Sequence, residues 1–366
     1  MHCAASSLEW RRQGLGARGW GLGMRVLQVD SGRRWRGGQH QVWLLCRALG
    51  REHGIEQVLV TKRDSELARR VAAAGIPVHG TTWDIGLDPR AWWQLRRTIA
   101  SFRPDVIHVH DSHALTLVAT IARGRTVVAT RRVEFHVGRF SAWRRPDRII
   151  AISEAVKRVL VAAGIAPEAV VVVYDGIDVE DVRRAATPSL EIRRQLSIPA
   201  AAPIVVNAAA LTGEKDHRTL IRAAHYARAL RPDLHWIIAG DGELRDSLVA
   251  DIHRLKLGDR VHLIGHVDRV DALIVEANVF ALSSKSEGLG SVLLDALALA
   301  RPVVATAAGG IPEILPSEAL VPVEAAEPLA QKVVQTLENP VPPPLPPRCS
   351  ASAMAHGVLD VYRALL

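Results

Sequence analysis

The chain has 366 residues, of which 48% are hydrophobic, and a formal net charge of +8. This length favours two domains over one, and the apolar content is ample for their buried cores. No apolar run reaches the ~18–20 residues that a membrane-spanning helix needs. No signal-peptide pattern is visible, and the three cysteines, which lack metal-binding spacing, suit a reducing compartment. We therefore expect a cytoplasmic protein.

The charge is divided unevenly along the chain. Residues 24–195 carry a net +10, whereas residues 196–366 carry a net −4. A positive first half indicates that this half meets something anionic. An arginine-rich coding bias would produce the same asymmetry, because lysine is rare throughout the sequence.

Residues 1–23 are rich in glycine and arginine and lack hydrophobic periodicity. They contain a Gly-x-Gly-x-x-Gly match at Gly14, Gly16 and Gly19, but no strand pattern precedes it and no helix pattern follows. The first strand pattern begins at Met24. We therefore expect residues 1–23 to be an extension, either disordered or the product of a misassigned start.

From Met24 onward, short apolar runs alternate with amphipathic helical patterns. Continuous β-branched runs separated by helices are typical of parallel strands that are buried on both faces. In the first half the predicted strands are 24–30, 57–61, 105–110, 126–130, 148–153 and 170–176. After a break, the second half adds 203–210, 234–240, 261–266, 279–284, 302–306 and 319–323. The sequence thus predicts two Rossmann-like, doubly wound α/β domains that face each other across a cleft.

The breaks in this alternation place the domain boundaries. We predict an N-terminal domain at 24–190 and a C-terminal domain at 200–338. A proline-rich linker follows at 339–349, which should be stiff and extended. The last segment, 350–366, has a helical pattern that would be marginal alone and must therefore dock.

One short segment of the second half combines several polar signals. Glu287 follows a predicted strand, and Gly288 and Gly290 allow a ligand to approach the backbone closely. A helix that begins near Ser291 would direct its free N–H groups and its dipole toward a phosphate. Asp295, on the first turns of that helix, could accept hydrogen bonds from a ribose diol. An ordinary helix with a solvated aspartate would show the same spacing.

The stretch SEGLGSVLLDALALARPVVATAAGGIPEIL resembles the donor-site signature of the GT-B glycosyltransferases of family 4, the glycosyl transferases group 1. RPDVIHVHDSHA, IIAISEAVKRVLVAAGI, LTGEKDHRTLIRAA and WIIAGDGELRDSL match the same family in order, and the resemblance covers the chain from Met24 to Leu366. It implies a GT-B fold whose C-terminal helix returns to the N-terminal domain. It also implies sugar transfer from a nucleotide-diphosphate donor with retained anomeric configuration, without a metal or another cofactor.

The resemblance places the donor site mainly in the second half. Asp295 stands where the family usually has the longer Glu, so its contact with the ribose is expected at shorter reach. Ala210 stands where the family often has Arg, five positions before Lys215. Lys215 would therefore carry more of the diphosphate charge, unless another arginine substitutes. The implied donor-binding residues are Gly37, Gly38, Lys215, Glu287, Gly288, Leu289, Gly290 and Asp295.

The strand ends of the first half supply further candidates. His110 closes a predicted strand and matches the active-site histidine of the family, whereas we assign His108 to the opposite strand face, toward the core. Arg131, Arg132 and Glu134 follow the next strand and are expected to bind the acceptor, although a basic surface loop would have the same composition. The implied catalytic residues are His110, Lys215 and Glu287.

Tryptophan and arginine lie together in three segments of the positive half, 33–38, 91–97 and 140–148. Tryptophan favours the membrane–water interface and arginine binds phosphates, so these segments predict an anionic acceptor or one presented at an anionic membrane. Peripheral binding to the cytoplasmic face of the inner membrane would follow. The alternative is buried tryptophan beside solvated arginine.

The sequence therefore predicts a retaining, metal-independent glycosyltransferase that acts on a glycan or glycolipid, such as lipopolysaccharide or another cell-envelope glycan. Two alternatives share the fold: a non-catalytic nucleotide-sugar-binding paralogue and a sugar-nucleotide epimerase. A nucleic-acid-binding protein is a third, but no helix-turn-helix, zinc or RNP pattern appears. No histidine or aspartate spacing typical of a metal site is present either.

Overall fold

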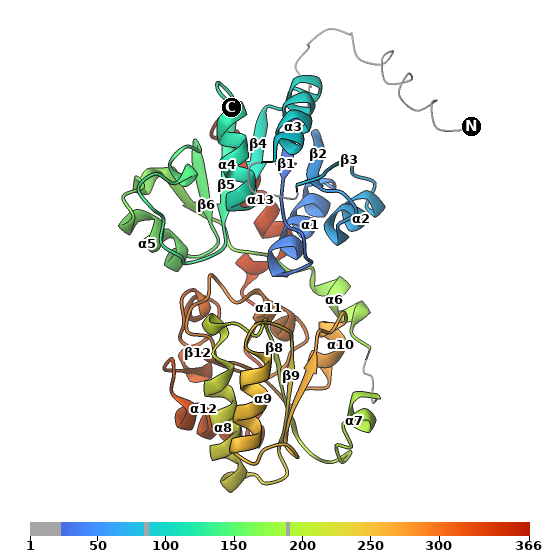
Figure 1. Cartoon of the computed structure of the whole chain (residues 1–366), viewed down its shortest axis with the longest axis vertical. Helices are drawn as coiled ribbons and strands as arrows, with labels where there is room; N and C mark the ends of the chain where they lie inside the picture. Colours follow the sequence, from blue (N-terminus) through green and yellow to red (C-terminus); the bar gives the residue numbers. More distant parts are fainter. Residues whose placement is uncertain (1–22, 84–87, 188–190) are drawn as a thin grey trace, which may run out of the picture.

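The computed structural model describes residues 23–83, 88–187 and 191–366 of the chain. The extension predicted at 1–23 lies outside these residues except for Gly23. Two parallel sheets covered by helices stand end to end along the long axis of the molecule (Figure 1). The predicted pair of doubly wound α/β domains is thereby confirmed.

The described part of the N-terminal domain contains a seven-stranded parallel sheet with the strand order β3-β2-β1-β4-β5-β6-β7. The sequence patterns missed β3, because VHGT is a short, partly exposed edge strand without an apolar run. The strands are β1 (Met24–Val29), β2 (Ile55–Lys62), β3 (Val78–Thr81), β4 (Val106–Val109), β5 (Thr126–Arg131), β6 (Arg148–Ala151) and β7 (Val170–Val172). The helices are α1 (Gly37–Leu49), α2 (Glu66–Ala73), α3 (Pro89–Phe102), α4 (Ser112–Ile121) and α5 (Glu154–Ala162).

The C-terminal domain repeats this plan, with six described parallel strands in the order β10-β9-β8-β11-β12-β13. The strand order reverses direction beside the first strand of each sheet, and ligands of such sheets bind at the carboxyl ends of the strands there. The strands are β8 (Ile204–Ala208), β9 (His235–Ala239), β10 (Val261–Gly265), β11 (Val279–Leu282), β12 (Val303–Thr306) and β13 (Leu320–Val321). The helices are α8 (His217–Leu230), α9 (Arg245–Arg254), α10 (Val270–Val275), α11 (Ser291–Ala298) and α12 (Ala326–Glu338).

Two segments connect the domains. The first contains α6 (Val179–Ala185) and α7 (Glu191–Gln195), and α6 packs against α10 and α11. The second runs from Asn339 through a short 3-10 turn, η7 (Pro347–Cys349), to the final helix, α13 (Ala351–Arg363). The backbone N–H of Ile177 donates to the Cys349 carbonyl oxygen at 2.9 Å, which holds the two connections together.

The C-terminal helix α13 returns to the N-terminal domain and packs against α1 (Figure 1). Its buried face includes Met354, Val358, Leu359 and Tyr362, which join a cluster with Leu45 and neighbouring residues. Burial of each large apolar side chain contributes about 1.5–3 kcal/mol, which a helix of this length requires because it would be marginal alone. The predicted return of this helix is confirmed.

Candidate functional site

Two helix N-termini, one from each domain, meet at the carboxyl ends of the sheets. Gly37 begins α1 and Ser291 begins α11, and a Cβ atom added to Gly37 would lie 2.9 Å from the Ser291 hydroxyl oxygen. Among the described residues, neither helix has a side-chain cap, and neither has an acidic residue in its first turn. Uncapped N–H groups and two positive dipole ends therefore converge, which is an arrangement that suits an anion.

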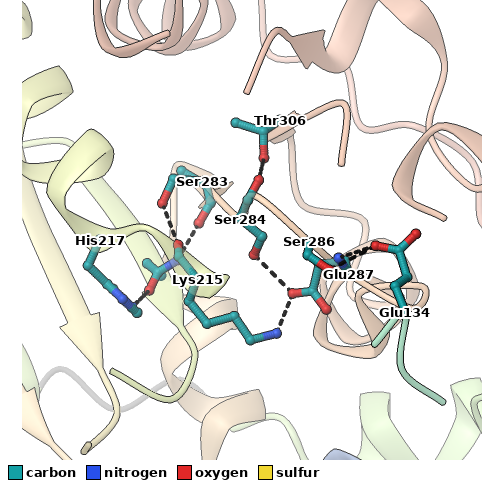
Figure 2. Close-up of polar contacts among 10 residues, drawn as sticks. Glu134, Lys215, His217, Ser283, Ser284, Ser286, Glu287 and Thr306 are labelled. Carbon is teal, nitrogen blue, oxygen red and sulfur yellow. Dashed lines mark hydrogen bonds and ion pairs between the residues drawn. The ribbon is translucent and has the colours of Figure 1, made fainter. Parts of the chain in front are cut away.

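An ion pair between Lys215 and Glu287 lies beside these helix ends (Figure 2). Lys215 ends the short turn η4 (Gly213–Lys215) that follows β8, and Glu287 follows β11, the neighbouring strand. The Ser284 hydroxyl donates to the Glu287 carboxylate at 3.0 Å. The Thr306 hydroxyl, at the end of β12, donates to the Ser284 carbonyl oxygen at 2.6 Å and fixes this turn. Glu287 is only 9% exposed, whereas the Lys215 side chain is 26% exposed, so the pair is accessible from the lysine side.

The turn that carries Glu287 also contacts the N-terminal domain. The carboxylate of Glu134 accepts hydrogen bonds from the Ser286 hydroxyl at 2.9 Å and from the Glu287 backbone N–H at 3.2 Å (Figure 2). A Cβ atom added to Gly288 would lie 2.2 Å from the Arg132 carbonyl oxygen, so only glycine allows this close approach. The two domains are thus in direct contact at the predicted donor site.

A second carboxylate, that of Glu313, also joins the domains, and it belongs to the C-terminal domain whereas Glu134 belongs to the N-terminal domain. It lies in the short turn η5 (Ile311–Glu313) of the C-terminal domain and accepts from the backbone N–H groups of Glu154 and Ala155, both at 2.8 Å. These N–H groups begin α5 of the N-terminal domain, so an acidic group from one domain caps a helix of the other. The Tyr174 hydroxyl donates to Glu313 at 3.0 Å. Burial and this bond raise the pKa of Tyr174 to about 12.

His110 lies at the end of β4 and is buried. Its Nε2 atom lies 2.7 Å from the Gln28 side-chain oxygen, whereas Nδ1 has no hydrogen-bond partner among the described residues. Burial, reinforced by the charges of His108 and Arg132, lowers the pKa of His110 well below its usual value. The imidazole is therefore neutral, and with a proton on Nε2 it presents the lone pair of Nδ1.

The assignment of His108 to the opposite strand face is wrong. Side chains alternate with a period of two along a strand, so His108 and His110 share a face, and their ring centroids are 4.2 Å apart. The expected burial of His108 nevertheless holds, with its nitrogens 2.6 Å from the Tyr362 hydroxyl and 2.7 Å from the Thr130 hydroxyl. Burial lowers its pKa to about 3. Tyr362 thereby links the C-terminal helix to the predicted active-site histidine.

The three predicted acceptor residues have different surroundings. Arg131 donates to two backbone carbonyl groups of the loop that follows it, and its guanidinium lies 4.8 Å from the Trp143 ring centroid. Arg132 lies 3.4 Å from the Asp175 carboxylate, and its Nη1 has no partner in the described part of the chain. Glu134 bonds across the domains, as described above. Their binding to an acceptor stays a prediction.

The remaining donor-site candidates lie around the two helix ends. Gly288, Leu289 and Gly290 form the turn before α11, and Leu289 is buried. A Cβ atom added to Gly38 would lie 3.9 Å from the Arg132 side chain. Asp295 is half-buried on α11, and the desolvation of its carboxyl group, with the Asp271 charge nearby, raises its pKa to about 7.

Sequence reasoning missed the two interdomain carboxylate contacts. The GGIPE stretch belongs to the family signature, but its Glu313 received no role because its partner helix lies about 160 residues earlier in the chain. Glu134 was assigned to the acceptor rather than to Ser286 for the same reason. As for metals, the described residues contain no group of three His, Cys, Asp or Glu side chains placed to hold an ion.

Comparison with known proteins agrees with this geometry. The family model of glycosyl transferases group 1 matches residues 188–355, and that of Glycosyltransferase Family 4 matches residues 33–181. The 2-deoxystreptamine glucosyltransferase of Streptomyces kanamyceticus is 26% identical over 83% of this chain and 90% of that protein. The N-acetylgalactosamine-N,N'-diacetylbacillosaminyl-diphospho-undecaprenol 4-alpha-N-acetylgalactosaminyltransferase of Campylobacter jejuni is 32% identical over 39% of this chain and 36% of that protein.

Solved structures show the same fold. Anabaena HepE in complex with UDP and glucose superposes with a TM-score of 0.74 at 21% identity, over 93% of this chain and 98% of that chain. A glycosyltransferase from Rickettsia africae gives the same TM-score at 18% identity, over 94% and 98% of the two chains. The chain thus has the GT-B fold and is an enzyme of the glycosyl transferases group 1 family.

Proposed function

We propose that the protein transfers a glycosyl group from a nucleoside-diphosphate sugar to a glycan or lipid-linked acceptor, with retained configuration and without a metal ion. The observation that carries this proposal is the convergence of two uncapped helix N-termini beside the Lys215–Glu287 pair. A diphosphate needs positive charge and N–H donors, and a sugar needs a carboxylate that accepts from its hydroxyl groups. The site brings both together at the ends of β8 and β11, beside the first residues of α1 and α11.

The main energetic cost of this reaction is the negative charge that develops on the leaving diphosphate. The bond from the sugar C1 to the phosphate oxygen breaks, and the acceptor oxygen bonds to C1 on the same face. The proton of the acceptor hydroxyl passes to the leaving phosphate oxygen. The amide groups that begin α1 and α11, together with the Lys215 ammonium, would stabilise that oxygen as its charge grows.

The other polar groups would orient the donor. Glu287, once Lys215 turns to the phosphate, accepts from the sugar hydroxyl groups. The neutral His110 accepts a hydrogen bond from a sugar hydroxyl group at Nδ1 and takes up no proton, because its low pKa keeps the imidazole unprotonated. Asp295 accepts from the ribose diol. The direct contacts of Glu134 and Glu313 between the domains would exclude water and limit hydrolysis of the donor.

Ala210 removes one cation that the family often places beside Lys215, and Arg132 is suited to replace it. Its side chain lies against Gly38 at the start of α1, and its Nη1 lacks a partner among the described residues. Its guanidinium would then serve the diphosphate rather than the acceptor. Loss of nucleoside-diphosphate affinity in Arg132→Ala would support this role, and loss of acceptor affinity alone would support the role first predicted.

Uridine diphosphate is the first donor nucleotide to test, because the structural neighbour HepE is described with UDP and with UDP-glucose. The acceptors named for the relatives differ, since one is 2-deoxystreptamine and another carries a diphospho-undecaprenol lipid. No described helix is both long and apolar enough to cross a membrane. From the tryptophan- and arginine-rich segments of the positive half, we propose a cytoplasmic protein that binds the cytoplasmic face of the inner membrane.

The experiment that tests the proposal is a thermal-shift comparison of UDP, GDP and ADP, followed by donor hydrolysis assays with the sugar nucleotides of the base that binds. One of the three diphosphates should increase Tm by clearly more than its nucleoside does. No shift with any diphosphate would contradict the proposal.

A further inference from the structure

The loop that follows β5 exposes an unusual set of apolar side chains. Phe140 is 96% exposed, Phe135 56% and Val133 39%. Single exposed apolar residues are common on protein surfaces, but several within one short loop form a patch that normally marks a contact with a partner. Glu134 lies between two of them and is turned the other way, toward Ser286 of the C-terminal domain.

Arg131 and Trp143 hold this loop in place from the interior of the domain. The Arg131 guanidinium donates to the carbonyl oxygens of Val133 at 3.1 Å and Phe135 at 2.6 Å. The same guanidinium lies over the ring of Trp143, which is buried. The sequence prediction for segment 140–148 therefore needs a correction, because its tryptophan is a support inside the domain. The aromatic side chain that reaches solvent there is Phe140.

The charge around the patch is positive. Arg139, Arg144 and Arg145 are exposed, and none of them forms an ion pair with a carboxylate of the described residues. Arg144 and Arg145 instead donate to backbone carbonyl groups. Between residues 131 and 146 the sequence has one acidic residue, Glu134, and its carboxylate is occupied by the contact with the C-terminal domain. The exposed side of the loop is thus both apolar and cationic.

The patch also borders the reaction centre. Glu134 bonds the backbone N–H of Glu287, so the exposed residues on either side of it lie next to the turn that would hold the donor sugar. A partner bound to this loop would therefore present its hydroxyl group close to the site of transfer. The arginines of this loop would repel a cationic acceptor and attract an anionic one.

We propose that the loop 133–145 is the surface by which the enzyme binds an anionic membrane and receives a lipid-linked acceptor. Phe135 and Phe140 enter the interfacial region of the bilayer, and the arginines bind lipid phosphates, for which the planar guanidinium is well suited. This inference rests on the proposed function and names the acceptor class, an amphipathic lipid that carries phosphate next to its sugar.

The test is co-sedimentation with vesicles of phosphatidylcholine alone and with increasing phosphatidylglycerol, at low and high salt. Binding of the wild-type protein should rise with the anionic lipid and fall with salt. The double substitution Phe135→Ser with Phe140→Ser should lower the bound fraction several-fold. Arg139→Glu should lower it mainly at low salt. Leu230→Ser is the matched control, because Leu230 is an equally apolar residue, 53% exposed on α8 of the other domain, and binding should not change.

Nucleotide binding, followed by thermal shift on the same variants, separates this proposal from the proposed function. The loop variants should keep both their Tm and their response to the diphosphate while losing vesicle binding. If the wild-type protein responds to the diphosphate but does not bind vesicles, the membrane-binding role of the loop is refuted and the proposed transferase function stands. Vesicle binding that Leu230→Ser weakens as much as the loop variants do would also overturn it.

Discussion

The Lys215 ammonium and the Glu287 carboxylate neutralise each other between the two turns that follow the adjacent strands β8 and β11. A diphosphate that takes the N–H groups of Lys215 must release Glu287, which then becomes free to accept from sugar hydroxyl groups. Binding of the phosphate and preparation of the sugar site are therefore coupled by one ion pair. This coupling makes Lys215 the first residue to test.

We expect Lys215→Ala to weaken binding of the nucleoside diphosphate far more than that of the nucleoside. The lost contact is a charge-assisted hydrogen bond of roughly 1.5–3 kcal/mol, equivalent to about 10- to 150-fold in Kd. Calorimetric titration with both ligands measures the difference. Lys285→Ala is the control, because Lys285 forms the same kind of pair with Glu324 on the surface, at 2.7 Å. Equal losses for diphosphate and nucleoside would refute the role.

Asp295 should make both stability and nucleotide affinity depend on pH. Its folded-state pKa of about 7 lies above the ordinary aspartate value of 3.8, so the folded protein binds the extra proton and the wild type loses stability as pH rises between these values. Asp295→Asn should match the wild-type Tm at low pH and exceed it near neutrality.

The nucleotide affinity that depends on Asp295 should change with pH in the direction opposite to stability. A ribose diol donates to the ionised carboxylate, so wild-type nucleotide affinity should increase as pH rises through about 7, while that of Asp295→Asn follows only the ionisation of the nucleotide's own phosphate. Calorimetry across this range gives the result. Parallel pH profiles for the two proteins would show that Asp295 does not contact the nucleotide.

Gln28 should control the protonation of His110. In the wild-type protein His110 stays neutral, so transfer should show no loss of activity at lower pH that is due to this residue. Gln28→Glu places a carboxylate on Nε2, which raises the pKa of His110 and converts Nδ1 from an acceptor into a donor as pH falls. We therefore expect kcat of Gln28→Glu to fall on the acid side and recover as pH rises.

The matched control for this substitution is Gln28→Leu, which should lower kcat without adding the new pH dependence. Nitrogen NMR of the imidazole reports the tautomer directly. A wild-type His110 that carries its proton on Nδ1 would contradict the assignment.

Glu313→Ala should loosen the contact between the domains. The variant leaves the N–H groups of Glu154 and Ala155 without their cap, for which losses of about 0.5–2 kcal/mol are typical. Chemical denaturation measures this loss, and small-angle scattering should show a more extended molecule. Glu318→Ala, an exposed neighbour in the next turn, is the control. Unchanged stability and shape would show that this contact does not hold the domains together.

Parallel-sheet topology explains why much of the site could be predicted. Lys215 and Glu287 each follow a strand, and the neighbouring positions of β8 and β11 bring them together without further information. Contacts between the domains could not be predicted from the sequence, and the hydrogen bond between Glu134 and Ser286 is an example. Nothing in the local pattern of either segment encodes its partner.

Other failures had local causes. β3 is too short and too polar to give a periodic signal. His108 was misplaced by an error of strand period. A tryptophan next to arginines in the sequence can lie at a membrane interface or inside the domain. The Trp143 ring is buried, and the Arg131 guanidinium lies over it. Composition alone does not separate these environments.

The central claim is that Glu287 lies in a working donor site, and release of nucleoside diphosphate from a sugar nucleotide tests it most directly. The wild-type protein should release it slowly without an acceptor and faster with one. Glu287→Gln keeps the size of the side chain and removes its charge, so release should fall roughly 10- to 150-fold while Tm changes little. Glu324→Gln should be unchanged. A wild-type protein that binds the diphosphate but turns over no sugar nucleotide, or a Glu287→Gln variant with full activity, would contradict the account.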